Sequence, residues 1–228
     1  YCEDGVRHEC RGGLYGGTRP SQSSAPIQCG SSALFCPFGS STPISVSPGH
    51  YSVQGTYDGT PDGSNVTRSW QRICEPGWYC IDGVKEPCKP GSYGSSTGLD
   101  TEMCDGSCLA GYYCNEASTS NMQHECGAVD LFCPTASFKP QHVRRGYYTA
   151  GGNETTRTNE IICERGSYCS GGIDYLCVAG TFGSEEGMAG PLNIGYNTEG
   201  KHNFRCSGWC PAGFACEQGT VDPVKCEI

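Results

Sequence analysis

The sequence is poor in hydrophobic residues and has no long apolar run. Only 36% of its 228 residues are hydrophobic, and no stretch of about 18 apolar residues is present that could cross a bilayer as a helix. Helical periodicity is almost absent, because apolar residues come singly or in pairs between Gly, Ser, Thr and Pro. We therefore expect no large apolar core, no helical fold and no membrane insertion in this segment.

The sequence also lacks the motifs of common enzymes. It has no GxSxG elbow, HExxH helix, phosphate-binding glycine loop or paired-carboxylate motif. The five histidines stand in unrelated contexts, and only one of them sits in a turn motif: they are His8, His50, His124, His142 and His202. We expect no enzymatic activity, no catalytic residue and no cofactor.

Basic residues are too few for a nucleic-acid surface. The chain has 15 Lys and Arg against 24 Asp and Glu, which gives a formal charge of −9 and a pI near 5.0. Nucleic-acid binding requires a basic stripe or patch. We exclude nucleic acid as a partner and interpret the acidic charge as a feature that keeps the surface soluble.

Cysteine and glycine are what the sequence has in excess. The 19 cysteines, 34 glycines and 14 prolines are typical of small disulfide-rich folds. In such folds crosslinks replace missing apolar burial, and each contributes about 2–4 kcal/mol. Disulfides persist in oxidising compartments, so we expect an extracellular protein, secreted or on a cell surface. No basic and apolar leader precedes Cys2, which predicts a mature or fragmentary chain.

An internal repeat organises the cysteines. The sequence CEPGWYC begins at Cys74 and its copy CERGSYC begins at Cys163, so the period is 163 − 74 = 89 residues. Upstream, YCEDGVRHEC matches YCIDGVKEPC, which starts at Tyr79, but the block that holds Cys104, Cys108 and Cys114 is missing there. We predict three repeats: a partial repeat at 1–73, a complete repeat at 74–162 and a truncated repeat at 163–228.

The motif C-x-x-G-x-aromatic recurs six times and predicts a tight turn followed by a strand. Glycine takes positive φ without steric cost, so each motif should turn directly after its cysteine. The predicted fold is a small disulfide-rich one, with tandem modules of short β-hairpins and loops, elongated, with almost no helix. The motif aromatics should form local cores rather than a ligand-binding ladder: they are Tyr15, Tyr79, Tyr93, Tyr113, Tyr168 and Phe182.

Two polar segments, residues 53–73 and 150–162, are expected to be loops at matching places in successive repeats. Each carries an Asn-x-Thr sequon, at Asn65 and at Asn153. A sequon in a surface loop of a secreted protein is an acceptor for N-linked glycans. We therefore predict glycosylation of both asparagines.

The cysteines are predicted to form disulfides, although spacing alone does not determine their connectivity. The predicted bridging residues are Cys2, Cys10, Cys29, Cys36, Cys74, Cys80, Cys88, Cys104, Cys108, Cys114, Cys126, Cys133, Cys163, Cys169, Cys177, Cys206, Cys210 and Cys216. Cys226 matches Cys126, and its partner would fall just past Ile228.

The partial repeat suggests a pairing, because cysteines tend to be lost in bonded pairs. It retains four cysteines, which favours Cys2–Cys10, Cys29–Cys36, Cys80–Cys88, Cys126–Cys133 and Cys169–Cys177. The counterparts of the missing four, namely Cys74, Cys104, Cys108 and Cys114, would then bond among themselves. The nested alternative, Cys10–Cys29 with Cys2–Cys36, stays open.

Metal binding is not expected. Cys104-x3-Cys108 and Cys206-x3-Cys210 bring thiols close together, but histidines are few and the cysteines are evenly spread. Asp58, Asp62 and Asn65 do not have the spacing of a calcium loop.

The motifs resemble a family of extracellular repeats. C-x-P-G-x-Y-C, then P-C-x-P-G-[ST]-Y-G, a close cysteine pair and G-Y-Y-C run best through residues 74–133. This pattern resembles the ephrin-receptor-like cysteine-rich repeats, which are similar in style to tumour-necrosis-factor-receptor and EGF-like modules. The close pair here is C-x3-C, where the family often has C-x2-C. Such arrays are also similar to protist surface proteins, including flagellar-hair (mastigoneme-type) proteins.

Two functions are consistent with the repeats and with this resemblance. The first is a non-enzymatic extracellular structural glycoprotein, a rod-like array that self-associates into a homo-oligomer or a fibre, or forms part of a surface appendage. The alternative is the ligand-binding ectodomain of a cell-surface receptor, which should carry a surface feature unlike its repeats.

Overall fold

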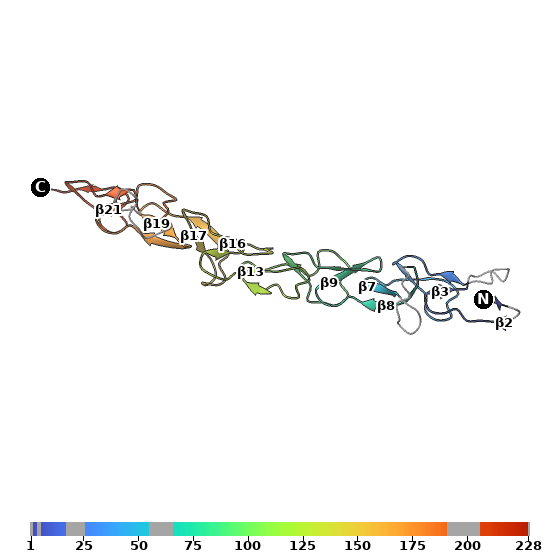
Figure 1. The fold of residues 1–228 in the computed structure, drawn as a ribbon. Coiled ribbons are helices and arrows are strands. Elements are labelled where there is room, and N and C mark those ends of the chain that lie inside the picture. The colour runs from blue at the N-terminus through green and yellow to red at the C-terminus, as the bar shows by residue number, and fades with distance from the viewer. Residues whose placement is uncertain (1, 4–5, 17–25, 55–65, 191–205, 228) are drawn as a thin grey trace. The chain divides into compact units, whose positions relative to one another are not determined.

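The computed structural model describes residues 2–3, 6–16, 26–54, 66–190 and 206–227 (Figure 1). Within these ranges there is no helix, and the chain forms 24 short strands, β1 to β24. The strands pair two by two in chain order, β1 with β2, β3 with β4 and so on, in separate two-stranded antiparallel sheets. The predicted tandem array of disulfide-rich hairpins is therefore confirmed. No helix in the described ranges is long and apolar enough to span a bilayer.

The chain divides into two compact units. The first unit comprises residues 1–107 and 115–121, and the second comprises residues 108–114 and 122–228. These units do not test the repeat boundaries at 73 and 162, which stay a prediction.

The strands of the two units are short and follow one another closely. The first unit contains β1 (Cys2–Glu3), β2 (Val6–Arg7), β3 (Leu14–Tyr15), β4 (Ile27–Gln28), β5 (Leu34–Phe35), β6 (Ile44–Ser45), β7 (His50–Gln54), β8 (Arg68–Ile73), β9 (Trp78–Ile81), β10 (Val84–Pro87), β11 (Ser92–Tyr93) and β12 (Gly106–Ser107). The second contains β13 (Tyr112–Tyr113), β14 (His124–Glu125), β15 (Leu131–Phe132), β16 (Gln141–His142), β17 (Tyr147–Ala150), β18 (Asn159–Ile162), β19 (Ser167–Ser170), β20 (Ile173–Leu176), β21 (Thr181–Phe182), β22 (Gly208–Trp209), β23 (Phe214–Ala215) and β24 (Val224–Lys225).

Both predicted polar loops are wrong at their ends. Residues 68–73 form β8 and pair with β7, and residues 159–162 form β18 and pair with β17. Both strands pair along their length with the preceding strand of the same hairpin. In the second segment residues 151–158 lie outside any strand, whereas residues 55–65 of the first lie outside the described residues.

Cysteine forms the core. The described side chains with less than 2% exposure are all cysteines: Cys36, Cys74, Cys88, Cys108, Cys114, Cys126, Cys133, Cys163 and Cys177. Among the motif aromatics only Tyr79 and Tyr168 are buried, at 9% and 6% exposure. The other four are half-buried, so the predicted aromatic cores are minor additions to the disulfides: these are Tyr15, Tyr93, Tyr113 and Phe182.

The predicted glycine turns are confirmed. All six motif glycines have φ between 83° and 90°: Gly13, Gly77, Gly91, Gly111, Gly166 and Gly180. Gly77 shows a second reason for glycine, because a Cβ there would lie 2.4 Å from the carbonyl oxygen of Ala117. Backbone between β13 and β14 approaches too closely for any side chain at this position.

A buried hydroxyl joins neighbouring hairpins in each unit. In the first unit the Ser52 amide donates to Gly83 O at 3.0 Å, and its hydroxyl donates to Ser32 O at 2.5 Å. A Cβ on Gly83 would lie 1.8 Å from the same Ser32 oxygen. The second unit repeats these contacts with Thr149, Gly172 and Val129. Contacts between neighbouring hairpins thus recur from the first repeat to the next, as the cysteine motifs do.

Candidate functional site

Disulfides are the dominant chemistry of the described residues. Eight are present: Cys29–Cys36, Cys74–Cys80, Cys88–Cys104, Cys108–Cys114, Cys126–Cys133, Cys163–Cys169, Cys177–Cys206 and Cys210–Cys216. Each joins a cysteine to the next one along the chain. Their Cα–Cα distances lie between 5.8 and 6.0 Å, within the usual range for a disulfide.

The predicted pairing is right in part. Cys29–Cys36 and Cys126–Cys133 are confirmed, which also excludes the nested alternative. Cys80–Cys88 is wrong, because Lys85 lies opposite Cys80 in the β9–β10 hairpin. Cys88 is three residues further along, about 10 Å away at the rise of a strand, too far for a disulfide.

The same hairpin geometry excludes the other local prediction. Cys169 lies opposite Asp174 in the β19–β20 hairpin, so Cys169–Cys177 is wrong for the same reason. The expectation that four cysteines bond among themselves holds only for Cys108–Cys114.

Cys10 was predicted to bridge to Cys2, and this prediction is wrong. Cys10 is a free thiol with 4% exposure. The side chain of Cys2 lies outside the described part of the structure. Cys10 follows a hairpin like that preceding Cys88, and this sequence match suggested the pairing.

Backbone hydrogen bonds place Cys10 at the position of Cys108 instead. The Gly13 amide donates to Cys36 O at 2.7 Å, as Gly111 does to Cys133 O at 2.8 Å. The Gly16 amide donates to Ser40 O at 3.1 Å, as Cys114 does to Ser137 O at 3.0 Å. Gly16 therefore occupies the position of Cys114. Cys10 has no disulfide partner because glycine stands where the second unit has that partner cysteine.

Cys226 is an exposed free thiol. Its amide donates to Gly213 O at 2.9 Å, as Cys126 does to Gly111 O at 3.0 Å. This confirms that Cys226 occupies the position of Cys126. The prediction that its partner lies just past Ile228 stays open.

One group of side chains has metal-ligand geometry, but its sulfurs are already bonded. Ligand atoms of Cys163, Cys169 and Asp174 lie within 4.8 Å of one another. The two cysteines form a disulfide, so neither offers the thiolate that zinc requires. The sequence-level zinc candidates, Cys104, Cys108, Cys206 and Cys210, are likewise all in disulfides. Asp58, Asp62 and Asn65 lie outside the described residues.

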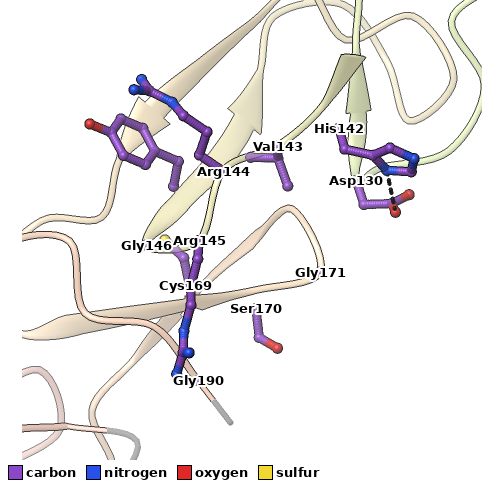
Figure 2. A pocket seen from close by; sticks show the side chains of 11 residues that line it. Asp130, His142, Val143, Arg144, Arg145, Gly146, Cys169, Ser170, Gly171 and Gly190 are labelled. Carbon is purple, nitrogen blue, oxygen red and sulfur yellow. Dashed lines mark ion pairs between the residues drawn. The ribbon is translucent and has the colours of Figure 1, made fainter. Parts of the chain in front are cut away.

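A shallow pocket of about 290 Å³ lies in the second unit, between the turn before β17 and the tip of the β19–β20 hairpin (Figure 2). It is lined by Asp130, His142, Val143, Arg144, Arg145, Gly146, Tyr147, Cys169, Ser170, Gly171 and Gly190. His142 and Asp130 form an ion pair in this pocket, with Nδ1 of His142 3.7 Å from a carboxylate oxygen of Asp130. This pair is open to solvent, because the His142 side chain is 82% exposed. Cys169 is in a disulfide, so it offers no nucleophilic thiol.

Arg144 is fixed at the edge of this pocket. Its guanidinium pairs with Glu160 and lies 4.1 Å from the ring centre of Tyr147. The Arg144 amide also donates to Glu160 at 2.9 Å. In the first repeat, Ser47 and Pro48 replace Arg144 and Arg145, so the basic pair belongs to the second unit alone.

A charged cluster in the first unit is satisfied internally. The Lys85 ammonium lies 2.6 Å from Glu75 and 4.6 Å from the ring centre of Trp78. The Tyr51 hydroxyl donates to Glu75 at 3.2 Å. The hydrogen bond from Lys85 is the main cause that lowers the pKa of Glu75. This cluster joins three strands and we interpret it as structural.

The loop after β17 presents the sequon at Asn153. Asn153, Glu154 and Thr155 are exposed, whereas Thr156 is buried at 7% exposure. Asn153 Oδ1 accepts hydrogen bonds from the amides of Thr155 and Thr156, at 2.9 and 3.0 Å, and from the Thr155 hydroxyl at 3.0 Å. The loop therefore holds the carboxamide oxygen inward. Asn65 lies outside the described residues.

Neither a protein-family model nor a curated protein matches the chain. The resemblance to ephrin-receptor-like repeats therefore rests on cysteine and glycine spacing. What is shown is a cysteine-rich chain of tandem disulfide-stapled β-hairpins.

Proposed function

We propose that the chain is a non-enzymatic structural segment of an extracellular protein, an extended array of disulfide-stapled hairpins that self-associates. The observation that carries this proposal is the cysteine core: eight disulfides in the described residues take the place of apolar packing. Disulfides in such number are maintained in oxidising compartments.

Contacts between successive hairpins support an array. In the first unit the Gly77 amide donates to Gly94 O at 2.7 Å, and the Gly94 amide donates to Ser118 O at 2.9 Å. In the second unit the same relay runs from Gly166 to Gly183 and on to Thr220, at 2.8 and 2.9 Å. Modules that bond mainly to their neighbours are typical of quasi-one-dimensional repeat proteins.

Small-angle X-ray scattering tests the extended array. A compact globule of this length would have a radius of gyration of about 17 Å, and we expect a clearly larger value. Sedimentation velocity over a concentration series tests self-association, and larger species should appear as concentration rises. A compact monomer at every concentration would contradict the proposal.

A ligand-binding ectodomain is the second candidate, and the pocket in Figure 2 favours it. The pocket has Arg144 and Arg145 where the first repeat has serine and proline, which is a surface feature unlike its repeat. Replacing both arginines by serine should abolish capture of a ligand if this candidate is correct, and should leave self-association unchanged.

A further inference from the structure

We propose that Asn153 carries an N-linked oligosaccharide, and that the folded loop presents its Nδ2 atom while keeping Oδ1 for its own hydrogen bonds. The inference rests on the proposed extracellular function, because the sugar is added along the secretory route. It concerns a covalent modification site, which the array proposal does not require.

The hydrogen bonds at Asn153 separate the two ends of its carboxamide. All three bonds that the side chain makes use Oδ1, and no hydrogen bond in the described part of the chain uses Nδ2. A group attached to Nδ2 therefore leaves each of these bonds intact. The asparagine is also exposed, so an attached sugar would project into solvent without displacing packed side chains.

Two glycine turns and a hydrogen bond close the loop around Asn153. Gly151 and Gly152 both have positive φ, at 75° and 63°. The Thr156 hydroxyl accepts the Asn153 amide at 3.0 Å, and a Cβ on Gly152 would lie 2.0 Å from Thr156 O. Thr156 thus closes the loop from inside, while Thr155 stands outside it.

The two sequons look equivalent in the sequence, but hydrogen bonds show that they are offset by one residue. Gly30 donates to Val66 O as Gly127 does to Thr155 O, and Cys36 donates to Arg68 O as Cys133 does to Arg157 O. The threonine of the first sequon, Thr67, therefore corresponds to buried Thr156 and not to exposed Thr155.

Thr67 is accordingly a packing residue as well as a sequon residue. It has 7% exposure, and its Cβ would lie 3.0 Å from a Cβ placed on Gly13. At the second sequon both Asn153 and Thr155 are exposed, whereas Asn65 lies outside the described residues. The structure thus distinguishes the two sequon threonines, Thr67 and Thr155, which the sequence alone treats alike.

The modification is a glycosyl transfer from a lipid-linked oligosaccharide diphosphate, catalysed by the transferase of the secretory pathway. A bond forms between Nδ2 and the anomeric carbon of the first sugar, and the bond between that carbon and the diphosphate oxygen breaks. Nδ2 loses one proton, and the lipid diphosphate leaves with the electron pair of the broken bond. No oxidant or reductant takes part.

The test is the intact mass of the chain secreted from a eukaryotic cell line, before and after enzymatic release of N-glycans. The variant Asn153→Asp keeps an oxygen acceptor for the two loop amides but has no Nδ2. We expect it to lose the mass of one oligosaccharide relative to the unsubstituted chain. In a peptide map, enzymatic release should convert Asn153 to aspartate.

Two neighbouring threonines supply a matched pair of controls. Thr155→Ala removes the sequon and should remove the same oligosaccharide, whereas Thr155→Ser should restore it. Thr156→Ala removes the buried hydroxyl but leaves the sequon, so it should lower the melting temperature and keep the sugar. If the oligosaccharide depended on the fold of the loop and not on the sequon, Thr156→Ala would lose the sugar and Thr155→Ala would keep it.

The inference is overturned if the mass of Asn153→Asp differs from that of the unsubstituted chain only by the amide-to-acid exchange. The mass of the chain after thiol alkylation, with and without prior reduction, counts the cysteines held in disulfides. This count tests the disulfide array separately from the sugar at Asn153. Complete disulfides without a sugar at Asn153 would overturn only the modification. Largely reduced cysteines in the secreted chain would overturn the disulfide array itself.

Discussion

Replacing Gly16 by cysteine should complete a disulfide that the first unit lacks. Cys10 is buried and free, and Gly16 makes the backbone hydrogen bond that Cys114 makes in the second unit. Cys108 and Cys114 are bonded there with a Cα–Cα distance of 5.9 Å. The introduced cysteine should therefore meet the thiol of Cys10 with little backbone movement.

The size of the stabilisation follows from the length of the ring. The new crosslink would have the sequence separation of 6 found for Cys108–Cys114. For a ring of about seven residues, the loss of chain entropy in the unfolded state corresponds to about 2.4 kcal/mol at 25 °C. For a chain of this length the melting temperature should rise by roughly 5–10 °C.

Thermal unfolding and thiol labelling in denaturant measure the two consequences together. In the Gly16→Cys variant both Cys10 and the introduced thiol should resist labelling until a reductant is added. Gly16→Ser is the control, because it adds a side chain of similar size without a thiol. The mirror variant Cys114→Gly should lose a similar free energy and leave Cys108 as a buried thiol. If Cys10 still labels fully in Gly16→Cys, the equivalence of the two sites is wrong.

Two further predictions concern a turn and a carboxylate. Gly77→Ala should lower the free energy of unfolding by about 2–4 kcal/mol in chemical denaturation, because of the positive φ and the contact with Ala117. The control is Gly39→Ala, where φ is also positive but an added Cβ meets nothing within 4 Å. It should lower the free energy of unfolding by about 1 kcal/mol. Equal losses would contradict the packing explanation. Hydrogen bonding to Ser95 lowers the pKa of Asp105 from 3.8, so its stabilisation is present above that pH and is lost as pH falls through the lowered value; acid titration of Asp105→Asn should lack this component.

The hairpins and their turns could be predicted from local sequence. A glycine three residues after a cysteine needs only its own backbone to adopt positive φ, and Gly13 and Gly180 do so alike in different units. The polar ends of the loops at 53–73 and 150–162 could not be predicted, because β8 and β18 are strands through bonds to β7 and β17.

The predicted disulfide pairing was correct for Cys29–Cys36 and Cys126–Cys133. Counting lost cysteines failed elsewhere, because it assumed that an unpaired thiol does not persist. In the structure Cys10 is an unpaired thiol and is buried. Assigning Cys10 to the position of Cys108 required the hydrogen bonds of Gly13 and Gly16.

The sequence by itself determined the kind of molecule: too little apolar surface for an ordinary core, cysteines in place of that core, and turns at each motif glycine. These properties depend on composition and on bonds between near neighbours in the chain. Only the tertiary structure decided which thiol has no partner and which sequon threonine is buried. Both depend on which backbone groups meet across separate hairpins. A shift of one residue along the chain changes a side chain from exposed, as in Thr155, to buried, as in Thr156.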